Sequence, residues 1–234
     1  MPRRSRCVLP GVPLHVIQRG NNRSPCFERE ADRRLYLALL RELCDLYECS
    51  IHAYVLMTNH VHLLATPEHS DSMSLIMKHL GQRYVQYVNR RYARSGSLWE
   101  GRFRSSMVDS AGYALVCQRY IELNPVRAGI VQHPADYRWS SFGANALGHP
   151  CDIVVPRAEY LALGEDELER RMHYLELFND ALSDRDLACI RDALNGGFAL
   201  GSDSFAREIE GRLHRRAIRG KPGRPSKAPA CSTQ

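Results

Sequence analysis

Two histidines separated by a single residue, His60 and His62, carry the strongest chemical signal in the sequence. They border and enter an apolar, β-branched stretch, residues 61–66, which is typical of a strand. Residues i and i+2 of a strand point to one face, so the two imidazoles stand side by side while Val61 and Leu63 enter the core. A pair of neutral imidazoles is half of a site for Zn²⁺, Mn²⁺ or a related ion and needs a third ligand. Alone, the pattern also fits one surface histidine and one hydrogen-bonded histidine.

A tyrosine on a predicted helix gives the second signal. Tyr120 and Asn124 are four residues apart, one turn along the same face of a helix that Ser110 can cap and that Pro125 ends. Tyr120 lies at the edge of the apolar arc, from which a phenol can reach a site on a sheet. Tyrosine is a usable nucleophile towards phosphodiesters when a nearby cation polarises the phosphate. A helix tyrosine taken alone is more often a core or surface residue.

The elements that must position these side chains follow from apolar periodicity and turn signals. Strands are expected over 14–20, 51–57, 61–66 and 103–109, and helices over about 28–46, 73–91 and 110–124. The order β, α, β, β, α, β, α predicts an α+β domain, an antiparallel sheet with helices packed on it in a ferredoxin-like arrangement. We expect this domain over residues 1–150, a helical appendage over 151–219, and a basic tail over 220–234 that stays disordered until it binds a partner.

Charge is distributed unevenly along the chain. Net charge is +7 over residues 1–157, −8 over 158–211 and +7 over 212–227. Two basic blocks on either side of an acidic stretch predict two surfaces that each meet a polyanion, because phosphate neutralisation needs local Lys and Arg. Solvated helix faces are the alternative interpretation.

The histidine and tyrosine motifs, taken together, resemble a known family. A histidine-hydrophobic-histidine strand followed some sixty residues later by one helix tyrosine is the layout of the HUH single-tyrosine transposases of bacterial insertion sequences. More narrowly, three segments in this order resemble the REP-associated tyrosine transposases, where REP stands for repetitive extragenic palindrome. They are Met57-Thr58-Asn59-His60-Val61-His62-Leu63-Leu64, Leu98-Trp99-Glu100-Gly101-Arg102-Phe103 and Tyr120-Ile121-Glu122-Leu123-Asn124-Pro125-Val126-Arg127-Ala128-Gly129. The resemblance covers about residues 1–150.

The resemblance implies a function and roles for particular residues. His60 and His62 would bind a divalent metal ion, Mg²⁺ or Mn²⁺, and Tyr120 would be the nucleophile that becomes linked to a 5′ phosphate. Asn124 stands where related enzymes have a glutamine that completes the metal shell. Because asparagine is one methylene shorter and precedes Pro125 here, another residue or water is the alternative third ligand. The implied substrate is single-stranded DNA folded into palindromic hairpins, cut without a nucleotide cofactor by one chain or by a homodimer.

Basic residues between and around the motifs are the candidate DNA contacts. Several alternate with the rings of Tyr84, Tyr87, Tyr92 and Trp99, a composition that can hold phosphates and stack unpaired bases. Packing of Tyr84, Tyr87 and Trp99 in the core is the alternative interpretation, so the prediction depends more on the arginines than on the rings. The tail segment Gly223-Arg224-Pro225 resembles an AT-hook, although Pro222 stands where that motif has a basic residue. The predicted DNA-binding residues are Arg3, Arg4, Arg83, Arg90, Arg91, Arg102, Arg104, Arg127 and Arg224.

Two other functions compete with a tyrosine transposase. One is a non-catalytic DNA-binding protein, repressor-like, on the same fold. The other is a metal hydrolase that uses His60, His62 and an activated water. Composition does not distinguish the three functions. The chain has eight cysteines without a Cys-x-x-Cys pair and no apolar run near the roughly 20 residues of a membrane span. No apolar segment follows the basic start, so we expect no secretory signal. We expect a cytoplasmic protein with reduced thiols and no membrane partner.

Overall fold

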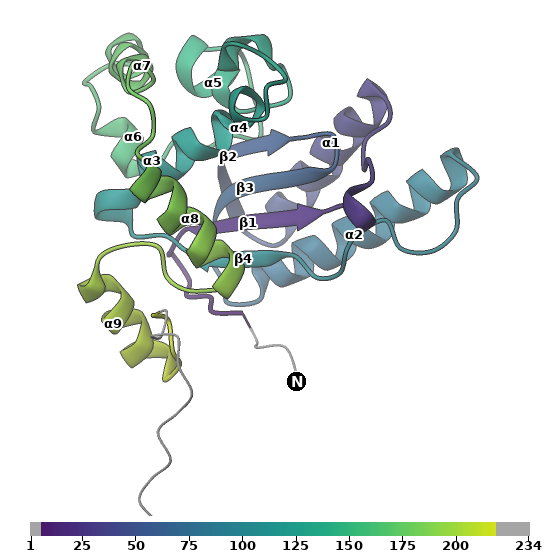
Figure 1. Ribbon diagram of the computed structural model, residues 1–234, viewed down its shortest axis with the longest axis horizontal. Helices are drawn as coiled ribbons and strands as arrows, with labels where there is room; N and C mark the ends of the chain where they lie inside the picture. Colours follow the sequence, from purple (N-terminus) through teal and green to yellow (C-terminus); the bar gives the residue numbers. More distant parts are fainter. Residues whose placement is uncertain (1–5, 219–234) are drawn as a thin grey trace, which may run out of the picture.

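A four-stranded antiparallel sheet is the centre of the protein (Figure 1). The coordinates are a computed structural model and describe residues 6–218. The strands are β1 (Leu14–Arg19), β2 (Cys49–Leu56), β3 (His60–Pro67) and β4 (Arg104–Met107), in the order β2-β3-β1-β4. With α1 (Glu30–Leu46), α2 (Ser72–Arg91) and α3 (Ser110–Glu122), the element order confirms the predicted α+β, ferredoxin-like fold.

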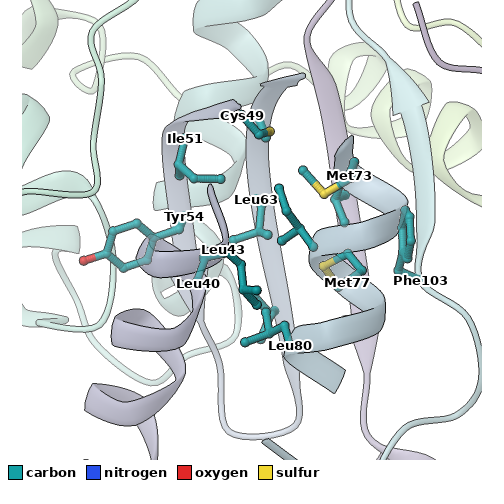
Figure 2. Close-up of a cluster of buried hydrophobic side chains, with 14 of the residues drawn as sticks. Leu40, Leu43, Cys49, Ile51, Tyr54, Leu63, Met73, Met77, Leu80 and Phe103 are labelled. Carbon is teal, nitrogen blue, oxygen red and sulfur yellow. The ribbon is translucent and has the colours of Figure 1, made fainter. Parts of the chain in front are cut away.

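Helices α1 and α2 pack on one face of the sheet, because apolar residues alternate along the strands. Val61 and Leu63 of β3 belong to this core together with Leu14 and Val16 of β1. Figure 2 shows side chains of α1 and α2, among them Leu40, Leu43, Met73, Met77 and Leu80, gathered around Leu63.

The opposite face carries a second, smaller core. Ala53, Val55 and Leu64 of the sheet contact Cys117 and Ile121 of α3 and residues of α8 (Asp184–Gly196). In Figure 1, α8 crosses in front of β1 and β4. Every second residue of β1 and β3 points into the main core. The residues between them therefore face α3 and α8, on the side away from α1 and α2.

The remaining helices surround α3 and the sheet edge. They are α4 (Asn124–Arg127), α5 (Phe142–Leu147), α6 (Ala158–Leu161), α7 (Glu167–Glu176) and α9 (Asp203–Leu213), with 3₁₀ turns η1 (Asn21–Arg23) and η2 (Pro134–Asp136). Helices α5, α6 and α7 share a small core with the outer side of α3. Leu200 pairs with Val108, and Ile209 of α9 is buried in the main core. No helix within residues 6–218 is long and apolar enough to span a membrane.

One buried carboxylate joins α3 to the helices that follow it. Glu122 accepts hydrogen bonds from Ser141 Oγ at 2.6 Å, Asn145 Nδ2 at 2.8 Å and Tyr174 Oη at 2.7 Å. Burial raises the pKa of Glu122 to about 7, against the lowering effect of those three hydrogen bonds. The C-terminal end of α3 is thus held by α5 and α7.

Candidate active site

Three histidines and one tyrosine meet on the sheet face that α3 covers. His60 and His62 have the same parity along β3 as Leu64, so they face α3 as the alternation predicts. Their ring centroids lie 5.1 Å apart. His15 of the neighbouring strand β1 joins them, with its ring stacked 5.0 Å from that of His62. Sequence reasoning missed this third imidazole, because only the β1–β3 register brings it to the site.

Asn59 fixes the orientation of His60. The amide Nδ2 of Asn59 donates to the carbonyl of Arg23 at 3.1 Å, so its Oδ1 faces His60 Nδ1, at 2.7 Å. A carbonyl oxygen only accepts, so His60 Nδ1 carries the proton and the lone pair lies on Nε2. The chain turn at Gly20 supports this arrangement, since its N–H donates to the Asn59 carbonyl at 2.8 Å. His60 therefore presents Nε2 as a metal donor.

His62 has a comparable partner in His15. The Nδ1 of His62 lies 2.8 Å from the Nε2 of His15, and both rings are buried. If His62 donates this hydrogen bond, its own Nε2 has the lone pair that a metal ion needs. The proton of His15 is then on Nδ1, which has no hydrogen-bond partner among the described residues. His15 is thus placed to orient His62.

All three imidazoles are neutral at physiological pH. Burial lowers the pKa of His15 to about 3. Burial, with a contribution from the charge of Arg19, lowers the pKa of His60 to about 4. The pKa of His62 is well below its usual value because of burial first, and then the nearby His15 and His60. Neutral imidazoles are the form that binds metal.

Tyr120 reaches this cluster from α3. Its ring makes edge contacts with His15 at 5.7 Å and His62 at 5.9 Å between centroids. The guanidinium of Arg127 lies over the Tyr120 ring, with Cζ 4.2 Å from the ring centroid, a cation–π contact. The structure therefore brings together the tyrosine and the histidines that the sequence singles out.

Asn124 lies one turn beyond Tyr120, at the start of α4. It is buried, and its Nδ2 donates to the Tyr120 carbonyl at 2.9 Å. Within residues 6–218, no group of three or more His, Cys, Asp or Glu side chains is arranged to hold a metal ion. The two imidazole Nε2 atoms are the donors here that could hold a divalent ion, and Asn124, another residue or water would have to complete its shell. A shell with only two protein nitrogens would leave positions for a substrate.

The predicted DNA-binding arginines fall into three groups. Arg83, Arg90 and Arg91 belong to α2, on the sheet face opposite the histidines, and Arg83 forms a bidentate pair with Glu42. Arg102 and Arg104 line a basic pocket on the histidine side, and Arg127 covers Tyr120. The last group, Arg3, Arg4 and Arg224, lies outside the described residues.

The aromatic residues that alternate with these arginines have structural roles. Tyr84 and Trp99 are buried in the main core, and Tyr84 Oη donates to the Cys26 carbonyl at 2.7 Å. Tyr87 and Tyr92 both donate hydrogen bonds to Asp32. Tyr84 and Trp99 are therefore core residues, which leaves them no free ring face for a base. Tyr87 and Tyr92 are half-buried, and base stacking on them stays a prediction.

Comparison with known proteins identifies the class that this fold and site define. Residues 9–124 match the family described as "Transposase IS200 like". That segment runs from just before β1 to Asn124 and contains the three histidines and Tyr120. Residues 9–124 belong to the IS200-like transposase family, whose members are enzymes that act on DNA.

Two relatives refine this assignment. A curated Haemophilus influenzae protein, named as a candidate REP-associated tyrosine transposase, is 25% identical in an alignment of 112 residues that covers 44% of this chain and 64% of that protein. The match thus spans less than two thirds of that relative. A solved structure of a REP-associated tyrosine transposase bound to a REP hairpin aligns with a TM-score of 0.54 and 19% identity, covering 67% of this chain and 93% of the other. The latter likeness supports the fold.

Proposed function

We propose that this chain is a metal-dependent endonuclease and strand transferase that cuts single-stranded DNA beside a hairpin through Tyr120. One observation carries the proposal: the Tyr120 ring lies 5.9 Å from His62, on the same face of the sheet as His60. A nucleophile and a pair of metal donors at this distance can act on one phosphodiester.

The metal-binding part of the site consists of two ligands and their orienting partners. His60 and His62 would hold the ion through Nε2, with Asn59 and His15 as orienting partners. When bound, a divalent ion polarises the scissile phosphate and stabilises its developing charge. Mn²⁺ suits an imidazole pair better than Mg²⁺, which prefers oxygen ligands in an octahedron. The Oδ1 of Asn124, or water, supplies the third ligand.

Tyr120 performs the covalent step. Its phenol oxygen attacks the phosphorus, and the bond from phosphorus to the 3′ oxygen breaks. The phenol loses its proton and the 3′ oxygen gains one. The products are a 5′-phosphotyrosine and a free 3′ hydroxyl, and the new ester keeps the energy needed to rejoin the strands. Arg127, over the tyrosine ring, places a positive charge beside the incoming phosphate.

The substrate we propose is a palindromic hairpin with a single-stranded flank. The structural relative named as bound to a REP hairpin supports this class of DNA. Of the described candidate arginines, Arg102, Arg104 and Arg127 lie on the histidine side, so we assign the contacts near the cleavage site to them.

A denaturing gel tests the proposal. The protein is incubated with end-labelled single strands copied from palindromes near its own gene, with and without Mn²⁺. We expect a protein band shifted by covalent DNA in the presence of Mn²⁺, and no such band for Tyr120→Phe. Tyr113→Phe, on the same helix, is the matched control and should form the adduct normally.

Two other outcomes of this experiment would support the two alternative functions. Cleavage that persists in Tyr120→Phe, with products free of protein, contradicts the proposal and indicates a metal hydrolase that uses water. Tight binding without cleavage under any metal condition indicates a non-catalytic DNA-binding protein.

A further inference from the structure

A basic pocket of about 460 Å³ opens beside the histidine cluster. Its lining includes Ile17 and Arg19 of β1, which pair with His62 and His60 in the β1–β3 register. Adjacent strands are about 4.8 Å apart. The pocket therefore begins one strand away from the proposed metal ligands.

Arginine is the most frequent residue type in the lining. The lining contains six arginines and a single carboxylate, that of Glu100. The arginines are Arg6, Arg19, Arg102, Arg104, Arg215 and Arg216. Among residues 6–218, no carboxylate oxygen lies within 4.0 Å of the guanidinium groups of Arg6, Arg19, Arg102, Arg104 and Arg216. Positive charges gathered without counter-ions repel one another, so an anion in the pocket would be stabilised.

The structure holds several of these guanidinium groups in place. Arg6 donates two hydrogen bonds to the Phe103 carbonyl, at 3.1 and 2.9 Å, and lies 3.5 Å over the Phe103 ring. Arg104 donates to Asn195 Oδ1 at 2.9 Å. Burial, and then the charge of Arg102, lower the pKa of Arg6 to about 10, so it stays charged at neutral pH. Ordered cations bind an anion with little loss of side-chain entropy.

The C-terminal part of the chain completes the pocket. The end of α8 contributes Asn195, Gly196 and Gly197, and the segment after α9 contributes Arg215 and Arg216. Arg215 Nη1 donates to the Arg6 carbonyl at 3.3 Å, which ties this segment to the N-terminal one. All five residues lie beyond residue 124, where the family match ends.

We propose that this pocket binds the sugar–phosphate backbone of the single-stranded flank next to the cleavage site, and that the C-terminal segment is thus part of the DNA-binding surface. The proposal rests on the proposed function for the identity of the polyanion. A flank that passes from Tyr120 over β3 and β1 meets Arg19 first and the other arginines next. The lining offers charge and hydrogen-bond donors for phosphates, whereas the aromatic rings nearby are engaged in the core.

A pair of double variants tests the pocket. Arg102→Ala with Arg216→Ala removes two exposed pocket charges. Arg207→Ala with Arg212→Ala removes the same charge from exposed positions of α9 outside the pocket. Each pair is made in a Tyr120→Phe background, and fluorescence anisotropy measures binding to one labelled hairpin with a single-stranded flank and to the same hairpin without it, over a series of salt concentrations.

Compared with the control double variant, the pocket double variant should bind the flanked hairpin at least about tenfold more weakly. The two double variants should bind the flankless hairpin with equal affinity. The slope of log K against log salt should fall by about 1.4 for two lost phosphate contacts to a single strand. Unchanged binding of the flanked hairpin, or an equal loss on both hairpins, would overturn the inference. Formation of the covalent adduct by the parent protein is measured separately. Absence of the adduct contradicts the proposed nuclease, whereas the dependence of binding on the flank tests whether the pocket holds that flank.

Discussion

At the scale of single residues, the site depends on which nitrogen of each histidine carries a proton. Asn59 determines this for His60, because its oxygen can only accept a hydrogen bond. His15 is in a position to do the same for His62. The sequence made the two ligand candidates visible by their spacing. It could not reveal their orienting partners, since Asn59 acts through a turn contact to Arg23 and His15 through pairing between strands.

Replacing His15 by leucine should weaken Mn²⁺ binding by about 10- to 100-fold, because His62 loses the partner of its Nδ1. Titration followed by the electron paramagnetic resonance of free Mn²⁺ measures the affinity directly. His52 is the matched control: it is buried in the same sheet but bonds to Thr66 and the Val155 carbonyl. His52→Leu should leave Mn²⁺ affinity unchanged. Equal Mn²⁺ affinities of the parent protein and His15→Leu would contradict the role of His15 as the residue that orients His62.

At the scale of secondary-structure elements, two anchors keep the site together. The turn after β1 holds the start of β3, where His60 lies, and the Glu122 cluster holds the end of α3, two residues after Tyr120. The periodicity of the sequence predicts these strands and helices, since each follows from local apolar spacing. It does not predict Glu122 as a buried anchor, because its partners Ser141, Asn145 and Tyr174 come from segments far along the chain.

Gly20→Ala should destabilise the fold by about 1–3 kcal/mol, because a Cβ at this position would collide with the Ser24 carbonyl oxygen. Gly81 is a matched control in the middle of α2, where an added Cβ meets nothing. Gly81→Ala should stabilise the protein by about 0.5–1 kcal/mol. Urea unfolding measures both. A Gly20→Ala protein as stable as the parent would show that the turn relaxes without cost.

Glu122 makes stability depend on pH in a defined direction. Its pKa in the folded protein, about 7, exceeds the value of 4.5 expected when it is exposed. The unfolded chain therefore releases this proton more readily, and the stability contributed by the protonated form is complete below pH 4.5 and is lost as pH rises through 7. The loss is on the order of 3 kcal/mol.

Glu122→Gln has no proton to lose, so its stability relative to the parent should increase between pH 5 and pH 8. The difference in unfolding free energy between the two proteins isolates Glu122, because the buried histidines titrate equally in both. A difference that stays constant over this range would show that Glu122 is ionised throughout.

At the scale of the whole molecule, the family segment and the C-terminal helices form one continuous structure around the sheet. The element order of residues 14–122 and the convergence of Tyr120 on His62 follow patterns that the sequence displays. The docking of α8 on β1 and β4 does not, because amphipathic helices show an apolar face without showing what it contacts. That docking is what completes the basic pocket.

The identity of the residue that carries DNA after cleavage distinguishes a Tyr120 nucleophile from every alternative. The covalent complex formed with Mn²⁺ is digested with protease and nuclease, and mass spectrometry locates the modified peptide. We expect a nucleotide attached through its 5′ phosphate to Tyr120. Attachment to any other residue, or efficient cleavage with no modified peptide, would contradict the assignment of Tyr120 as the nucleophile.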